Sequence, residues 1–432
     1  MKLNILYIMH TWIDLTDVER TSIGGTTLHA YDIINTTKNK YNYFVLSVSN
    51  NMYILNTYID GKSKVYNLGV KCVTYGFDKY NISYKKMLQK IIDVLKIDVI
   101  HIHHLLGHTY DILNVLNNNN KIKKIITIHD YFLACPQINL LYKSTRYCEK
   151  ERLNKCKKCV NKNIDVKVRN NIVQQLLKVC DDVIIPNASL EKELKTFFKD
   201  VNYEVIEHGI DIKKYQMKSK NKNEKFNVAF VGVLEILKGS NLVKQIIKNN
   251  TNNKIMYHFW GTTSDDFFKH DRKNYNYHGE YKRQEICKIL NGKVDLICLL
   301  TICPETYCYT LSEAIYSGIP ILGINLGAIG NRIKTHDVGW LVEKDASYED
   351  IIKKIEYIID NRVEYNNKVE NIKKINLKTT KEMVEEIISK YNVKYKKKQE
   401  KIDYDFEIVN SFNRNIIFKC KKIVKKVFKR KG

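Results

Sequence analysis

Short apolar runs alternate with longer stretches of helical periodicity along most of the chain. In the first half these runs predict strands at Leu3–Met9, Tyr43–Val48, Asp98–His103, Ile125–His129 and Val183–Pro186. In the second half they predict strands at Asn227–Gly232, Lys254–Gly261, Leu296–Leu300 and Ile319–Ile324. Short, mostly apolar strands between helices are typical of parallel sheets covered on both faces. The pattern therefore predicts an α/β fold with two doubly wound, Rossmann-like sheets, one in each half.

A polar stretch at Lys213–Lys225 follows the last strand of the first half and is typical of a linker. We expect an N-terminal domain at 1–204, with a cysteine-rich insertion at about 135–160, and a C-terminal domain at 205–375. An apolar stripe that includes Met383 and Ile387 predicts a helix within 376–400, which we expect to return to the N-terminal domain. The rest, 401–432, is expected to be a basic amphipathic tail.

The charge of the chain favours anionic partners. Its 432 residues include 72 Lys and Arg against 47 Asp and Glu, a formal net charge of +25. Within 413–432, lysines interleave with apolar residues, which predicts contact with an anionic membrane surface. Aromatic residues for stacking on bases are sparse there, so nucleic acid is not an expected partner.

The N-terminus and the hydropathy pattern together predict a cytoplasmic protein. Met1–Met9 is too short for a secretory signal, and no apolar run reaches the roughly 18 residues that a membrane-spanning helix needs. Together with the tail, this predicts a peripheral position on the inner face of the cytoplasmic membrane.

The segment Cys303–Ala314, which follows the apolar run Leu296–Leu300, carries the most informative chemistry. A strand ends, a loop presents Glu305, and a helix is predicted to open near Tyr307. Free N–H groups and the helix dipole attract phosphate at such a point. Glu305 and Glu313 flank the helix start at a separation of roughly 10 Å, given a rise of 1.5 Å per residue. That separation suits a nucleotide sugar, with one acid for the sugar hydroxyls and one for the ribose hydroxyls.

This Glu-x7-Glu segment, Pro-Glu-Thr-Tyr followed by Leu-Ser-Glu-Ala, resembles the signature of retaining glycosyltransferase family 4. The resemblance implies the GT-B architecture, two Rossmann-like domains with the donor between them. It implies that Glu305 contacts the donor sugar and Glu313 the ribose. The same helix start places further donor-binding candidates, which are Tyr307, Tyr309, Thr310 and Leu311.

Other segments match the same family in the expected order. Phe230-Val231-Gly232 and Lys238-Gly239 resemble its glycine loop and phosphate-binding lysine, so Lys238 is expected on the diphosphate. The family usually has an arginine directly after that glycine, whereas this chain has Val233. The second domain continues with segments that resemble the next strand, glycine loop and closing strand, which are Gly318–Gly323, Gly327–Gly330 and Gly339–Val342.

The N-terminal half supplies three further candidates. Gly24 and Gly25, before a helix predicted at Leu28–Ile34, allow close approach of a backbone to the diphosphate. By the resemblance, His129 touches the donor sugar and is a catalytic candidate, and His208 belongs to the interdomain segment, where a hinge and packing role is expected.

The four cysteines of the insertion, Cys135, Cys148, Cys156 and Cys159, form a Cys-x12-Cys-x7-Cys-x2-Cys set. Four thiolates on a polar loop suit a structural zinc, and free thiols are the open alternative. His101 and His103 share one face of a predicted strand, so two metal ligands are conceivable there, although structural or acceptor-side roles are the preferred interpretation.

The resemblance thus implies a glycosyltransferase that transfers a sugar from a nucleotide-diphosphate donor, with retention of configuration and without a bound divalent metal. By analogy with the family, the acceptor is a polysaccharide or glycolipid of bacterial surface glycan synthesis. The rival enzymes with the same fold are a sugar-nucleotide epimerase and a phosphorylase, and a non-enzymatic binder of anionic membranes is the rival from another class. A dinucleotide-dependent oxidoreductase is disfavoured, because no Gly-x-Gly-x-x-Gly follows the first strand.

Overall fold

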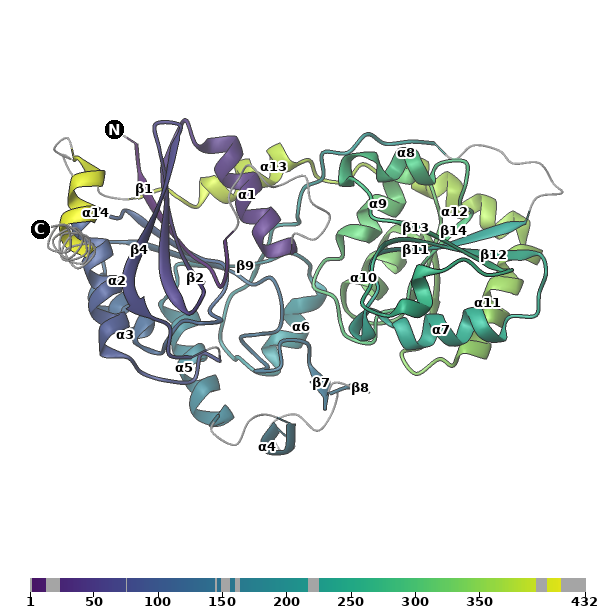
Figure 1. The fold of residues 1–432 in the computed structure, drawn as a ribbon, viewed down its shortest axis with the longest axis horizontal. Helices are drawn as coiled ribbons and strands as arrows, with labels where there is room; N and C mark the ends of the chain where they lie inside the picture. Colours follow the sequence, from purple (N-terminus) through teal and green to yellow (C-terminus); the bar gives the residue numbers. More distant parts are fainter. Residues whose placement is uncertain are drawn as a thin grey trace, which may run out of the picture.

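The computed structural model describes residues 2–12, 24–74, 76–143, 146–148, 156–159, 164–216, 225–393 and 402–412. Figure 1 shows two lobes, each built around its own sheet with helices on its faces. The predicted α/β class with two Rossmann-like sheets is therefore confirmed.

The first sheet has eight strands in the order β10-β9-β6-β5-β1-β2-β3-β4. Its strands are β1 (Asn4–Ile8), β2 (Asn42–Ser49), β3 (Met52–Ile59), β4 (Lys62–Lys71), β5 (Val99–Ile102), β6 (Lys123–Thr127), β9 (Asp182–Ile185) and β10 (Glu204–Val205). Its core is parallel, but β3 pairs antiparallel with both β2 and β4. The hydrophobic pattern missed β3 and β4, because β4 alternates exposed and buried positions instead of forming an apolar run.

The first domain is completed by helices on both faces of this sheet and by a small insertion. The helices are α1 (Gly25–Thr37), α2 (Ile82–Val94), α3 (Asp111–Asn118), α5 (Val166–Val179) and α6 (Ser189–Lys195). The insertion holds β7 (Leu141–Tyr142), β8 (Arg146–Tyr147) and α4 (Cys156–Cys159).

The second sheet has six strands in the order β13-β12-β11-β14-β15-β16, and all its neighbours pair in parallel. Its strands are β11 (Phe226–Val233), β12 (Ile255–Thr262), β13 (Tyr275–Gly279), β14 (Leu296–Leu299), β15 (Ile321–Ile324) and β16 (Gly339–Val342). In chain order this is 3-2-1-4-5-6, so the winding reverses between β11 and β14. A crevice at the carboxyl ends of those two strands is where such a sheet binds ligands.

The helices of the second domain follow its strands in regular alternation. They are η2 (Ile236–Lys238), α7 (Ser240–Asn249), η3 (Asp266–Lys269), η4 (Arg283–Glu285), α8 (Ile286–Leu290), α9 (Tyr309–Ser317), α10 (Gly327–His336), α11 (Tyr348–Asp360) and α12 (Arg362–Lys374). Helix α11 begins with a capping box between Ser347 and Asp350, which satisfies two otherwise unpaired N–H groups.

The last two described helices return to the first lobe (Figure 1). Helix α13 (Thr380–Ser389) buries Met383, Val384 and Ile387 in the core that also contains residues of β1 and α1. Helix α14 (Tyr404–Phe412) buries Ile408 in the other core cluster of the first domain, and Asp405 pairs with Lys64 of β4.

We expected a basic amphipathic tail at 401–432. At its start the structure differs from this expectation, because residues 404–412 form a helix that packs against the first domain and has acidic residues in its first turn. The amphipathic part, 413–432, lies outside the described residues. Within the described part of the chain, no helix combines the length and the apolar character that crossing a bilayer requires.

Candidate active site

A cleft of about 370 Å³ opens between the two domains, at the carboxyl ends of the central strands of both sheets. Every predicted catalytic and donor-binding residue lines it except Leu311, whose side chain is fully buried in the core beneath α9. The lining residues are Gly24, Gly25, Thr26, Leu28, His129, His208, Gly232, Val233, Lys238, Tyr281, Arg283, Glu305, Thr306, Tyr307, Cys308, Tyr309, Thr310 and Glu313. The cleft therefore brings together segments far apart in the sequence.

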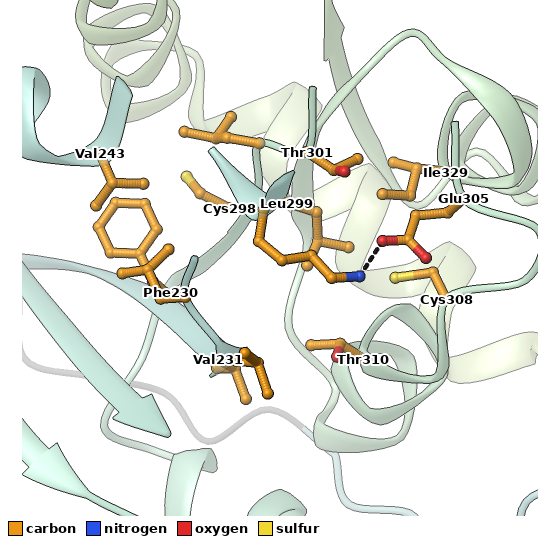
Figure 2. A pocket seen from close by; sticks show the side chains of 14 residues that line it. Phe230, Val231, Val243, Cys298, Leu299, Thr301, Glu305, Cys308, Thr310 and Ile329 are labelled. Atoms are coloured by element: carbon orange, nitrogen blue, oxygen red, sulfur yellow. Dashed lines mark hydrogen bonds and ion pairs between the residues drawn. The ribbon is translucent and has the colours of Figure 1, made fainter. Parts of the chain in front are cut away.

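Lys238 and Glu305 meet at the point where the winding of the second sheet reverses. Lys238 follows β11, Glu305 follows β14, and the Lys238 Nζ donates to Glu305 Oε1 (Figure 2). Burial lowers the pKa of Lys238, but the neighbouring Glu305 carboxylate raises the pKa and outweighs burial. The pKa of Lys238 is therefore above its usual value. Lys238 is thus a permanent positive charge in the cleft.

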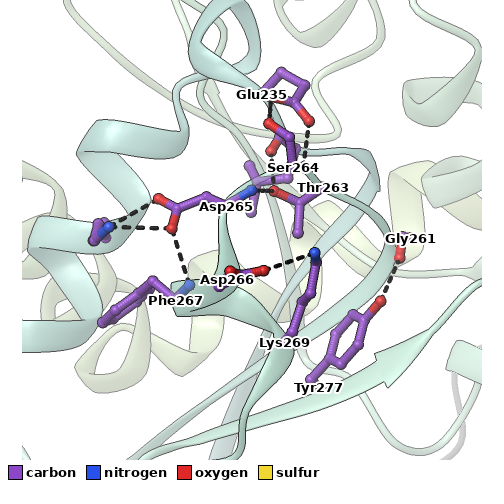
Figure 3. A network of polar contacts seen from close by, with 11 residues as sticks. Glu235, Gly261, Thr263, Ser264, Asp265, Asp266, Phe267, Lys269 and Tyr277 are labelled. Atoms are coloured by element: carbon purple, nitrogen blue, oxygen red, sulfur yellow. Dashed lines mark hydrogen bonds and ion pairs between the residues drawn. The ribbon is translucent and has the colours of Figure 1, made fainter.

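The loop that carries Lys238 is fixed from two sides. Gly239 has φ +83°, and a Cβ there would lie 2.0 Å from the carbonyl oxygen of Leu300, so glycine alone fits. On the other side, Ser264 donates its N–H and its hydroxyl to the Glu235 carboxylate at 2.6 and 2.7 Å (Figure 3). These contacts tie the loops after β11 and β12 together and hold Lys238 in place.

The loop that carries Glu305 is held from below by α10. The Ala328 N–H donates to the Glu305 carbonyl at 2.8 Å. Arg332, which is only 1 % exposed, donates to the carbonyls of Tyr307 and Cys308 at 3.0 Å each. Sequence reasoning missed Arg332, because nothing in its local pattern shows that an arginine on α10 reaches under another loop.

Helix α9 begins at Tyr309, two residues later than predicted. The reason is Cys308, which has φ +69° and interrupts the helical backbone directly before it. Tyr309 and Thr310, in the first turn of α9, line the cleft. N–H groups in the first turn of a helix have no partner from a preceding turn.

Glu313, in the second turn of α9, is paired with a residue that the sequence did not single out. The Arg283 Nε donates to Glu313 Oε1 at 3.2 Å, and its guanidinium lies 4.7 Å from the centre of the Tyr309 ring. Burial raises the pKa of Glu313, and Arg283 opposes that shift.

Arg283 and Lys238 are the cationic side chains among the described lining residues, and Val233 is a neutral wall residue. Arg283 thus adds a second cation to the cleft, on the side of Glu313. Strand β13 precedes Arg283 in the sequence, and predicting this strand would have placed Arg283 near the ligand-binding edge of the sheet. The hydrophobic pattern missed β13 as well.

The two domains touch directly at the cleft. The Thr306 hydroxyl donates to the carbonyl of His129 at 2.6 Å, and the Tyr307 hydroxyl donates to the carbonyl of His208 at 2.6 Å. A Cβ added to Gly25, the first residue of α1, would lie 3.3 Å from Cε2 of Tyr309. The missing side chain at Gly25 therefore permits this close approach.

The N-terminal wall contains neutral histidines. His129 lies two residues beyond the end of β6, and its Nε2 is 3.1 Å from Nδ1 of His103. His208 stacks on Tyr309 at a centroid distance of 5.3 Å, so the predicted hinge residue also forms part of the wall. Burial lowers the pKa values of His103, His129 and His208 well below the usual value, which keeps these rings uncharged.

His101 does not belong to this wall. Its two ring nitrogens contact Thr127 Oγ1 at 2.8 Å and the Tyr391 hydroxyl at 2.9 Å, in the core between the sheet and the segment after α13. The structural interpretation of His101 agrees with these contacts.

The four cysteines of the insertion all lie in described residues, half-buried and without a disulfide. Their sulfurs do not form a group compact enough for one ion. In the described ranges, the group that does so consists of His29, His103 and His129. The zinc assigned to Cys135, Cys148, Cys156 and Cys159 stays a prediction.

Two family models match consecutive parts of the chain. Residues 23–214 match Glycosyltransferase Family 4, and residues 211–375 match Glycosyl transferases group 1. No curated protein sequence matches the chain significantly.

Solved structures share the fold at low sequence identity. Sucrose-phosphate synthase from Thermosynechococcus elongatus is 11 % identical with a TM-score of 0.60, covering 90 % of this chain and 98 % of its own. HepE from Anabaena, in complex with UDP-glucose, is 14 % identical with a TM-score of 0.58 and the same coverage of 90 % and 98 %. A variant of TarM from S. aureus, in complex with fondaparinux, α-GlcNAc-glycerol and UDP, is 12 % identical with a TM-score of 0.52, covering 91 % and 100 %.

The family models and the GT-B neighbours agree with the cleft described above, in which two acids and two cations flank a helix start at the reversal point of the sheet. The chain belongs to the group 1, family 4 glycosyltransferases, enzymes that take their sugar from a nucleotide-sugar donor.

Proposed function

We propose that this glycosyltransferase transfers a hexose with retention of configuration to a polysaccharide or glycolipid acceptor in bacterial surface glycan synthesis. The donor lies across the cleft, with its diphosphate near Lys238 and the start of α9. The observation that carries the proposal is that Glu305 and Glu313 are both on the cleft wall and each is paired with one cation, Lys238 or Arg283.

The paired charges explain how the cleft accepts an anionic donor. In the empty cleft each acid neutralises one cation, so no charge is left isolated at low dielectric. A bound diphosphate takes over the Lys238 ammonium, which frees Glu305 to accept hydrogen bonds from the sugar hydroxyls. Glu313, held by Arg283, accepts from the ribose hydroxyls.

Catalysis in this arrangement is mainly stabilisation of the departing diphosphate. Its negative charge grows as the bond to the sugar breaks, and Lys238 and the N–H groups at the start of α9 are already oriented toward it. His129, on the opposite wall, contacts the sugar. We expect these protein groups to suffice without an added divalent metal, so that transfer persists in the presence of a chelator.

The acceptor enters over the N-terminal domain, and the enzyme works in the cytoplasm at the inner face of the membrane. Deleting 413–432 tests the membrane contact by sedimentation with anionic liposomes. The deletion starts after Phe412, because α14 is packed against the first domain and its loss would expose Ile408. Binding that is unchanged by the deletion contradicts a membrane role for the tail.

The function is tested with a panel of nucleotide sugars, starting with UDP-glucose because the neighbour HepE holds it. We expect one donor to raise the melting temperature, and Glu305→Gln to reduce both donor hydrolysis and transfer by about 10²-fold or more. The matched control is Glu343→Gln, which changes an acid of the same domain outside the cleft lining. Wild-type rates in Glu305→Gln contradict the site assignment.

The same assay separates the rival enzymes. An epimerase converts the donor to its isomer with the nucleotide still attached, and a phosphorylase consumes inorganic phosphate. A glycosyltransferase releases free nucleoside diphosphate in step with glycosylated acceptor. Isomerised donor or phosphate-dependent turnover would replace the transferase proposal.

A further inference from the structure

Three histidines from three separate elements meet beneath the N-terminal wall of the cleft. His29 lies on α1, His103 follows β5, and His129 follows β6. One ring nitrogen of each lies within 4.8 Å of those of the other two. The three residues are 1, 2 and 9 % exposed, so the group is almost closed to solvent.

The hydrogen bonds of this histidine group are incomplete. His103 Nδ1 and His129 Nε2 are 3.1 Å apart and satisfy one another. Within the described residues, both nitrogens of His29, Nε2 of His103 and Nδ1 of His129 are buried with no partner. Burying an unsatisfied polar group costs about 1–3 kcal/mol. Several such atoms gathered at one place indicate that the site is built for a ligand.

The donor chemistry of the group suits a metal ion. A neutral imidazole has one bare nitrogen, which is the form that ligates metals. The group contains no carboxylate, which excludes the oxygen-rich shells of Mg²⁺ and Ca²⁺.

The spacing also fits a transition metal. Two ligands of a tetrahedral ion with bonds of about 2.0–2.1 Å are roughly 3.3 Å apart. The ring nitrogens of this group lie within 4.8 Å of one another, which is near that separation. Three histidines leave a fourth position. His208 lies beside the group, its ring centre 4.5 Å from that of His29, and its Nδ1 is buried without a partner among the described residues.

We propose that His29, His103 and His129 form a binding site for a divalent transition metal of the Zn²⁺ type, with its fourth position toward the cleft. This binding does not depend on the proposed acceptor or donor. It has a consequence for the enzyme, because an ion held there engages His129, which lines the donor cleft.

The experiment must separate this site from the cysteines of the insertion. The full chain carrying Cys156→Ser and Cys159→Ser is stripped with a chelator and titrated with Co²⁺, and its zinc content after loading is measured. We expect one ion per chain, with the visible absorption of tetrahedral Co²⁺ and without thiolate charge-transfer bands. No binding in this background overturns the proposal.

Ligand variants test the assignment. In the same background, His29→Gln and His103→Gln should each weaken Co²⁺ binding by at least about 10-fold. The control is the double change His258→Gln and His278→Gln, which removes another histidine pair, 3.0 Å apart, in the C-terminal domain. We expect this control to bind as the parent does, and unchanged binding in both ligand variants contradicts the site.

A measurement without ligand variants covers the case in which a buried substitution fails to fold. The X-ray absorption edge of zinc bound to the full chain in the Cys156→Ser, Cys159→Ser background reports the ligand atoms directly. Scattering from imidazole rings is expected. A shell of sulfur, or of oxygen and nitrogen without imidazole scattering, overturns the proposal.

Discussion

The two walls of the cleft differ in charge. The C-terminal wall contains the ion pairs Lys238–Glu305 and Arg283–Glu313, fixed by loops at the ends of β11, β13 and β14. The N-terminal wall contains uncharged rings, with His129 and His208 against the ring of His29 on α1. In the proposed function, the charged wall binds the diphosphate and the uncharged wall faces hydroxyl groups.

The contrast shows how the cleft can contain four charged side chains at low energetic cost, because each acid is paired with a cation. An isolated buried charge is expensive, but a pair whose partner is exchanged for the ligand avoids that cost before and after binding. The neutral wall contains no ion pair whose partner a ligand could replace. Substitutions on the charged wall should therefore act on turnover and on local stability, whereas those on the neutral side should act more weakly.

The largest effect is expected from Lys238→Met, which keeps the length of the side chain and removes its charge. The departing diphosphate then lacks its cation, so kcat for donor hydrolysis and transfer should fall by about 10²–10³-fold. Steady-state kinetics with the donor identified from the panel measures this.

Lys244→Met is the matched control for Lys238→Met. Lys244 pairs with Asp265 at 2.9 Å in the same domain but does not line the cleft. Its kcat should remain within about two-fold of the wild type, since a partly exposed ion pair contributes little. Equal losses of kcat in the two lysine variants would contradict a specific role of Lys238 in stabilising the departing diphosphate.

The second effect concerns the Arg283–Glu313 pair. Arg283→Met leaves Glu313, only 4 % exposed, without its cation and should lower the free energy of unfolding by about 1–3 kcal/mol. Adding Glu313→Gln in the same chain removes the unpaired charge and should recover most of that loss. Urea unfolding of the single and double variants measures the coupling, and additive effects would show that the pair is not coupled.

Asp32 on α1 connects the two walls, because its charge interacts with Arg283 across the cleft. Burial raises the pKa of Asp32 to about 7, and Arg283 opposes the shift. The folded state then binds more protons than the unfolded state, so this stability contribution is lost as the pH rises from about 4 to about 7.

Asp32→Asn should remove that dependence. Relative to the wild type, the variant should gain about 1–2 kcal/mol in free energy of unfolding between about pH 5 and pH 8. Urea unfolding across this range measures the difference. A parallel pH dependence in both proteins would mean that Asp32 is ionised normally in the folded state.

The smallest effect is expected from Gly25→Ala. Its Cβ would press on the Tyr309 ring at 3.3 Å, so that KM for the donor should rise by a few-fold, about 2–5, as the walls shift slightly apart. Alanine favours the helix over glycine by about 0.5–1 kcal/mol, so the melting temperature should not fall. Gly24→Ala, whose Cβ would meet nothing within 4 Å, should change KM less. Equal changes in the two variants would contradict the role of the contact with Tyr309.

The sequence alone determined the parts that depend on local pattern. Buried parallel strands must be apolar throughout, so β1, β5, β11 and β14 were visible as short runs. The Glu-x7-Glu segment, through its resemblance to the family signature, predicted Glu305 and Glu313 as site residues, and both line the cleft.

The tertiary structure decided everything that depends on packing between distant segments. Strand β4 was not predicted because most of its positions are exposed and it has no apolar run. Strand β3 is largely buried, but Asn56 and Thr57 interrupt its apolar run. Helix α14 was not predicted because its docking on β4 depends on a distant segment and not on its own periodicity.

Arg283 and Arg332 acquired their roles only when Glu313 of α9 and the carbonyl of Tyr307, 30 and 25 residues away in the sequence, came within hydrogen-bond reach. The histidine group also depends on packing between distant segments. One helix and the ends of two strands supply its rings, and only the folded sheet brings them together.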